Sequence, residues 1–139
     1  MTLKEYFHNT RGTGILATAD NEGRTDAAIY SRPHIMDDGS LAFIMRERLS
    51  FNNLQSNPHA TFLFMEQDAH LKGLRLFMKK TGEDANHELI SSMTRRNISP
   101  EEDKAAGPKH IVYFSLEKAL ALVGGKEIDI ETLTKGRAI

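Results

Sequence analysis

Residues 40–66 read SLAFIMRERLSFNNLQSNPHATFLFME, and this stretch decides the fold. Two strongly apolar runs flank a connection rich in arginine, serine and asparagine. Leu49, Phe51 and Leu54 predict a short helix with Ser50 as its N-cap, and Asn57-Pro58 predicts its end. The stretch is therefore expected to form a strand, a short helix and a second strand. By itself, the polar connection fits either a solvated turn or a site where guanidinium and backbone N–H groups bind a phosphate.

The preceding residues predict an antiparallel meander. GILATAD (14–20) and TDAAIYSRPHIM (25–36) have strand character, and NEGR between them has turn chemistry. Pro33 predicts a bulge or an edge position. Asp37-Asp38-Gly39 predicts a tight turn into SLAFIM.

The remaining chain predicts a mainly β domain with inserted short helices. Helices are expected over the first ten residues and over 83–97, where Glu83 and Asp84 precede Arg95 and Arg96 in the order that suits a helix dipole. A strand is expected over 73–82, and a strand or strand pair over 110–123. Residues 100–107 are expected to be a polar loop. Residues 1–124 form the expected domain, and 125–139 a tail that packs on a partner or stays mobile.

About six short antiparallel strands in a small chain favour a barrel, because closure removes exposed edges. The runs AFIM and TFLFM are apolar at nearly every position, so both faces of these strands should be covered. Helices or a second subunit could supply the outer cover. We expect a homodimer.

Composition excludes several functional classes. The 139 residues are 40% hydrophobic and 27% charged, with 18 Lys and Arg against 19 Asp and Glu and a formal charge of −1. That balance argues against a general nucleic-acid binder. No apolar run is long enough to span a bilayer, and cysteine is absent, so the expectation is a cytoplasmic protein without disulfides. The six histidines lack a tight metal-ligand spacing, and no metal site is expected.

The order GILATAD, NEGR, TDAAIY, turn, SLAFIM, R-x-R, LSFNNLQSNPHATFLF resembles the pyridoxamine 5′-phosphate oxidase-like FMN-binding split barrels over residues 3–124. The closing VYFSLEKALALVGG adds to the likeness. The resemblance implies a six-stranded antiparallel split barrel that dimerises, with FMN held at the subunit interface.

The resemblance also implies a set of cofactor-binding residues. Its phosphate contacts fall on Arg32, Arg48 and Ser50, with Arg46 and Asn53 near enough to assist. Its flavin ring contacts fall on Ala28, Ile29, Tyr30 and Ser31 of the second strand and on Phe43, Ile44 and Met45 of the third.

Two departures separate the chain from the true oxidases. Their S-R-K triplet is replaced by Arg48-Leu49-Ser50, so Arg32 or Arg46 would have to supply the missing cation. The oxidases also end in a segment rich in Arg and Trp, whereas this chain has no tryptophan.

The expected function is therefore that of an FMN-dependent oxidoreductase, passing electrons or hydride from a reduced donor such as NAD(P)H to a small acceptor. No catalytic residue is assigned. Tyr30, His34 and His110 are candidate proton donors, and Lys72, Arg75 and Lys79 are candidate contacts for a nicotinamide phosphate. The alternatives are a flavin- or haem-binding module without turnover, with His70 or His110 as the haem ligand, or an interaction or stress protein without cofactor.

Overall fold

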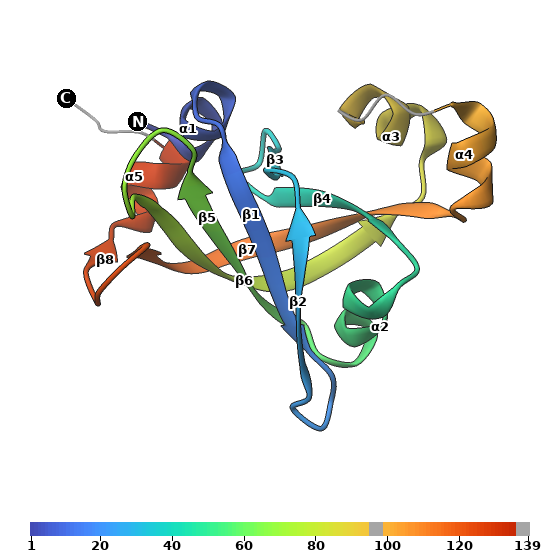
Figure 1. The fold of residues 1–139 in the computed structure, drawn as a ribbon, viewed down its shortest axis with the longest axis horizontal. Helices are drawn as coiled ribbons and strands as arrows, with labels where there is room; N and C mark the ends of the chain where they lie inside the picture. The colour runs from blue at the N-terminus through green and yellow to red at the C-terminus, as the bar shows by residue number, and fades with distance from the viewer. Residues whose placement is uncertain (95–98, 136–139) are drawn as a thin grey trace.

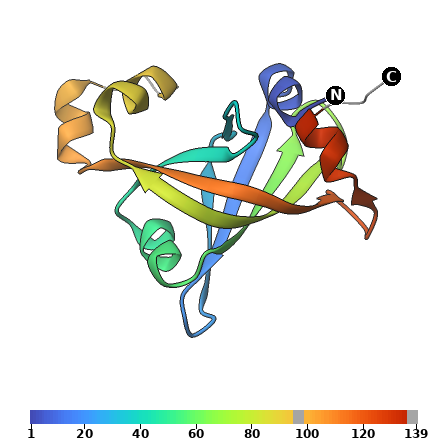
Figure 2. The same ribbon diagram turned by 180° about the vertical axis from the view of Figure 1, so that it is seen from behind.

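The computed structural model describes residues 1–94 and 99–135, which form one curled antiparallel sheet with short helices at its rims (Figures 1 and 2). The strands are β1 (Gly12–Ala19), β2 (Thr25–Tyr30), β3 (His34–Ile35), β4 (Leu41–Arg46), β5 (His59–Glu66), β6 (Gly73–Asp84), β7 (Lys109–Ala121) and β8 (Glu127–Ile128). The helices are α1 (Leu3–Asn9), α2 (Leu49–Ser56), α3 (His87–Met93), α4 (Pro100–Ala105) and α5 (Ile130–Lys135).

The strand order is β2-β1-β5-β6-β7-β4-β3, and β8 pairs with β7. The two edge strands, β2 and β3, follow each other in the chain and are joined by residues 31–33, so the sheet curls back toward its own start. This is the mainly β split barrel that the sequence predicts. Its described residues form eight strands rather than six, because β3 and β8 add two-residue pairings.

Phenylalanines fill the barrel interior. Phe43 lies 5.2 Å from Phe62 and 5.6 Å from Phe114, measured between ring centroids, at angles typical of packed aromatic side chains. A side chain at Gly14 would have to enter the Phe62 ring, since a Cβ there would lie 2.4 Å from a ring carbon. Close packing of that ring therefore requires glycine at position 14.

The strongly apolar strands have different outer covers. On β4, Ala42 and Ile44 pack with Ile90 and Met93 of α3, so the chain itself covers this outer face. On β5, no such cluster among the described residues covers Leu63 and Met65, and Met65 is 42% exposed. Within the part of the chain that the structure describes, the expectation of two covered faces is met for β4 and not for β5.

The region between β6 and β7 differs from the expectation. Strand β6 runs on to Asp84 and the helix begins only at His87, because Glu83 and Asp84 continue the pairing with Val112 and Ile111. The predicted loop instead contains α4, whose first turn is capped by the Ser99 hydroxyl. Arg95 and Arg96 lie outside the described residues.

The C-terminal segment packs on the barrel of the same chain. Ile128 of β8 and Ile130 lie against the main core, and Leu133 of α5 is 8% exposed within it. Strand β7 is a single strand over the predicted 110–123 region. In residues 1–94 and 99–135, no helix is long and apolar enough to cross a membrane.

Candidate functional site

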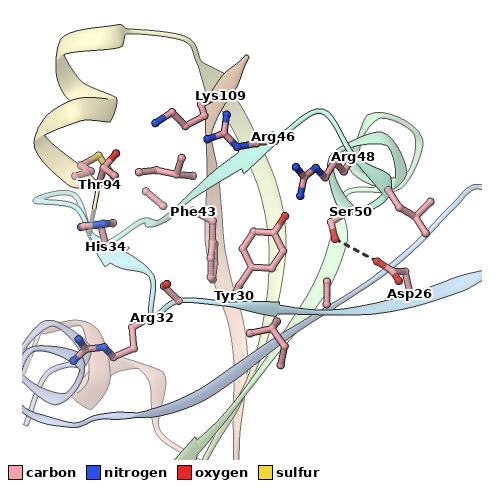
Figure 3. A pocket seen from close by; sticks show the side chains of 17 residues that line it. Asp26, Tyr30, Arg32, His34, Phe43, Arg46, Arg48, Ser50, Thr94 and Lys109 are labelled. Atoms are coloured by element: carbon pink, nitrogen blue, oxygen red, sulfur yellow. Dashed lines mark hydrogen bonds between the residues drawn. The ribbon is translucent and has the colours of Figure 1, made fainter. Parts of the chain in front are cut away.

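A cleft of about 500 Å³ opens between β2, β4, the start of α2 and the end of α3 (Figure 3). This volume falls in the range of small-molecule sites. Ten of the twelve predicted cofactor residues line the cleft: Ala28, Ile29, Tyr30, Ser31, Arg32, Phe43, Ile44, Arg46, Arg48 and Ser50. It is also lined by Asp26, His34, Ala42, Leu49, Met93, Thr94 and Lys109.

Met45 and Asn53 lie elsewhere. Met45 is 1% exposed and packs in the barrel core, on the same face of β4 as Phe43. Asn53 is buried in α2 and donates a 3.0 Å hydrogen bond to the Thr18 hydroxyl of β1. The structure therefore gives these two residues positions in the packing behind the cleft and not on its wall.

The start of α2 presents donors to one end of the cleft. The N-cap is Arg48 and not Ser50, and no side-chain hydrogen bond caps the helix. The N–H groups of residues 49–51 therefore have no partner within the helix. The Arg48 side chain is exposed, with no hydrogen bond or ion pair to any of the described residues. Together with the Ser50 hydroxyl, these groups are donors of the kind that bind an anion at a helix N-terminus.

The other two predicted arginines are turned away. Arg32 Nη1 donates to the carbonyl oxygens of Phe7 and Thr10, at 2.5 and 3.0 Å, so its guanidinium points at the end of α1 (Figure 3). Arg46 donates to the Asp103 carboxylate at 2.7 Å and to the Gly107 carbonyl at 2.6 Å. Arg32 and Arg46 thus bind helical segments to the barrel. Of the three predicted arginines, Arg48 is the one whose guanidinium lies at the start of α2.

Asp26 is an acid at the same end of the cleft. Its Oδ2 lies 3.4 Å from Ser50 Oγ, a long hydrogen bond (Figure 3). A phosphate here would meet this carboxylate, so Arg48 and the helix N–H groups have to outweigh it. Asp26 shares the β2 face of Ala28 and Tyr30, and the two-residue strand period was the signal that could have identified it.

Tyr30 and Phe43 form the aromatic part of the cleft wall, with centroids 6.1 Å apart and nearly perpendicular rings. Burial raises the pKa of the Tyr30 hydroxyl, an effect that the nearby Ser50 hydroxyl and Arg48 charge partly oppose. Tyr30 is therefore protonated at neutral pH and offers a hydrogen-bond donor to the cleft.

Several other candidates lie outside the cleft. His110 Nε2 lies 3.0 Å from a Glu47 carboxylate oxygen, and its ring stacks on Phe51. His70 is exposed in the β5–β6 turn, whereas His34 lines the cleft. Lys72, Arg75 and Lys79 lie in that turn and on β6, and Arg75 donates to the carbonyl oxygens of Ala121 and Gly124. The described residues contain no group of three or more acidic or histidine side chains that could hold a metal ion.

A curled antiparallel sheet with a cleft between β2 and β4 defines a split-barrel protein. Solved structures share the fold. An FMN-binding protein from Syntrophomonas wolfei aligns with TM-score 0.68 and 16% identity, covering 88% of this chain and 85% of its own. A protein described as F420 reductase aligns with TM-score 0.65 and 17% identity, covering 84% of this chain and 94% of its own. A heme binding protein from Mycobacterium smegmatis aligns with TM-score 0.61 and 15% identity, covering 96% of this chain and 59% of its own.

No family model and no curated protein sequence matches the chain. The structural likeness establishes the split-barrel fold implied by the resemblance to the pyridoxamine 5′-phosphate oxidase-like proteins. At these sequence identities, the structural likeness shows a shared fold and does not show a shared activity.

Proposed function

We propose that the protein binds FMN in the cleft, with the flavin phosphate at Arg48, Ser50 and the first N–H groups of α2. The observation that carries the proposal is that the Arg48 guanidinium and the N–H groups of residues 49–51, which have no partner within α2, lie at one end of a concave site. A phosphate dianion needs several charge-assisted hydrogen bonds, and a guanidinium can give two in parallel. The FMN-binding and F420-reductase structures of the same fold support a flavin-type ligand.

The aromatic and apolar wall of the cleft suits the flavin ring. Tyr30, Phe43 and Ile44 supply its contact surface, and Ala28 leaves space beside β2. When bound, FMN supplies hydride and electron transfer chemistry. The residues of the chain would orient the ring, exclude water and hold the Tyr30 proton near the reacting groups. We propose an oxidoreductase with a reduced donor of the NAD(P)H class and a small acceptor, acting in the cytoplasm.

We also propose a homodimer with the cleft at its interface. Ile29, Ile15 and Leu63 lie directly across from one another on β2, β1 and β5, on the face opposite the core. Ile29 is 72% exposed and also lines the cleft. A second copy would bury this apolar row and would close the cleft on the side where Ile29 is exposed.

The first test is the absorbance spectrum of the purified protein, taken before FMN addition and again after FMN addition and desalting. Retained bands near ~375 and ~450 nm are the expected result for a bound flavin. Arg48→Ala should lose the bands on desalting, and the exposed Arg11→Ala should keep them. A colourless wild-type protein with no affinity for FMN in calorimetry would refute the proposal.

Haem is the second candidate, favoured by the likeness to the heme binding protein and by the position of His34 on the cleft wall. Imidazole is a common axial ligand of haem iron. The same spectrum after haem addition would show a Soret band, and His34→Ala should remove it. An unchanged Soret band in His34→Ala would exclude this mode of ligation.

A further inference from the structure

The far end of the cleft, away from Arg48, has its own chemistry. Thr94 at the end of α3, His34 and the side chain of Lys109 from the start of β7 lie at this end (Figure 3). Met93 and Ile44 also line the cleft and pack together in one apolar cluster. The walls therefore combine an apolar patch with polar groups that lie well away from the α2 start.

This end of the cleft has an excess of positive charge. Lys109 and Arg46 are direct cross-strand partners on β7 and β4, a placement in which like charges destabilise a sheet. One oxygen of Asp103, from α4, lies 2.7 Å from each cation. Two cations against one carboxylate leave a net charge of +1 in this cluster. Asp26 is the one acid among the described cleft-lining residues, and it lies at the other end beside Ser50.

Within this cluster, the Lys109 ammonium has N–H groups that no other member uses. Arg46 donates to the Asp103 carboxylate, the Asp103 carbonyl and the Gly107 carbonyl. The Lys109 ammonium has Asp103 as its one ion-pair partner in the described residues, and it carries three N–H bonds. At least one of them is available to a ligand in the cleft.

We propose that this end is a second subsite that binds the carboxylate or phosphate group of a small organic substrate through Lys109. Ile44 and Met93 contact the organic part of the ligand, and the Thr94 hydroxyl oxygen, whose hydrogen is donated to Ile90 at 2.7 Å, can accept a hydrogen bond. The role of this subsite in binding a substrate rests on the proposed flavin function. Its preference for anions is independent of that function.

The test uses ligand-observed fluorine NMR with 4-(trifluoromethyl)benzoate and its neutral isostere, 4-(trifluoromethyl)benzamide, each with and without FMN. Wild-type protein should bind the benzoate more tightly than the benzamide. Lys109→Gln should weaken benzoate binding about tenfold or more, the effect of losing a charge-assisted hydrogen bond, and should leave the benzamide unchanged. Lys109→Arg should restore most of the preference. The exposed Lys79→Gln, on β6, should behave as wild type.

Equal affinity of wild-type protein for the two probes would overturn the proposal, even if Lys109→Gln does not fold. An unchanged benzoate affinity in folded Lys109→Gln would also overturn it. Benzoate binding that depends on Lys109 in a protein that does not bind FMN would keep the anion subsite and refute the flavin function. FMN binding without any preference for benzoate would keep the flavin function and refute the anion subsite.

Discussion

At the residue scale, the three arginines predicted to bind phosphate differ in their partners. Arg48 reaches into the cleft, whereas Arg32 donates to carbonyls at the end of α1 and Arg46 is tied to Asp103. Guanidinium groups satisfied by buried or half-buried carbonyls are costly to move, since the acceptors would lose their donors. The phosphate affinity of the site should therefore depend mainly on one side chain.

Arg48→Ala should weaken FMN binding by about 1.5–3 kcal/mol, roughly 10- to 150-fold in Kd, because a charge-assisted hydrogen bond is lost. Isothermal titration calorimetry measures the change. Arg11→Ala, which removes an exposed arginine next to β1, is the matched control and should bind FMN as the wild type does. Equal affinities of the two variants would place the phosphate elsewhere.

At the element scale, α2 and the α3–α4 segment set the two ends of the cleft. Helix α2 is fixed to the barrel by its apolar residues Phe51 and Leu54 and by the buried Asn53–Thr18 hydrogen bond. The α4 helix is fixed by Asp103, which binds cations from two strands at once. Each helix thus has a polar contact with the barrel whose loss has a defined consequence.

Asn53→Ala should lower the free energy of unfolding by about 1–3 kcal/mol, because the Thr18 hydroxyl would be buried without its donor. Urea denaturation monitored by circular dichroism gives the value. Asn52→Ala, an exposed neighbour in the same helix, should change stability by less than about 0.5 kcal/mol. If the two variants were equally stable, the buried hydrogen bond would contribute nothing measurable.

Asp103→Asn should destabilise the protein at neutral pH, since Arg46 and Lys109 would face each other without a carboxylate. Hydrogen bonds from Lys109 and then Arg46 lower the pKa of Asp103 below its ordinary value of 3.8. A lowered pKa in the folded state means that the contribution to stability is present above that ordinary value and is lost as the pH falls through the folded value.

The melting temperature of Asp103→Asn should therefore lie below that of the wild type at pH 7, and the gap should disappear as the pH falls through the lowered pKa of Asp103. Glu101→Gln, an exposed acid in the same helix with no ion pair to the described residues, is the matched control and should show no such gap. A gap independent of pH would mean that the carboxylate charge is not what stabilises α4.

At the scale of the whole molecule, the outer face of the sheet is covered over β4 and exposed toward the edge strand β2. Helix α3 covers the outer face of β4, while the outer row of Ile29, Ile15 and Leu63 continues to the exposed edge strand β2. An apolar row that ends at an exposed edge is typical of an interface between copies of a chain.

Ile29→Asp should convert the proposed dimer to a monomer, because a carboxylate would be buried without a partner in the interface. Sedimentation velocity over a concentration series measures the state. Val123→Asp replaces a residue that is 59% exposed near the β7–β8 turn and should stay dimeric. A wild-type protein that is monomeric at every concentration would contradict the proposal.

The sequence predicted the main strands and helices from α1 to α3 but not α4 or β8, and the family resemblance implied most of the residues that line the cleft. The apolar strand runs, Asn57-Pro58 and the Asp37-Asp38-Gly39 turn are local signals, and the structure bears them out, with Gly39 in the left-handed region at φ 88°. Ala28 and Tyr30 were implied by the family resemblance, and the two-residue period of a strand explains why they share one face of β2.

Only the tertiary structure decided where the charged groups point. Arg46 is 57 residues from Asp103 in the chain and 63 from Lys109, and Arg32 is 25 from Phe7, so no local pattern predicts these contacts. Sheet register brought Lys109 opposite Arg46, and burial turned Met45 and Asn53 away from the cleft. The physical reason is that local propensity fixes backbone conformation, whereas the partners of a polar side chain depend on which strands and helices pack beside it.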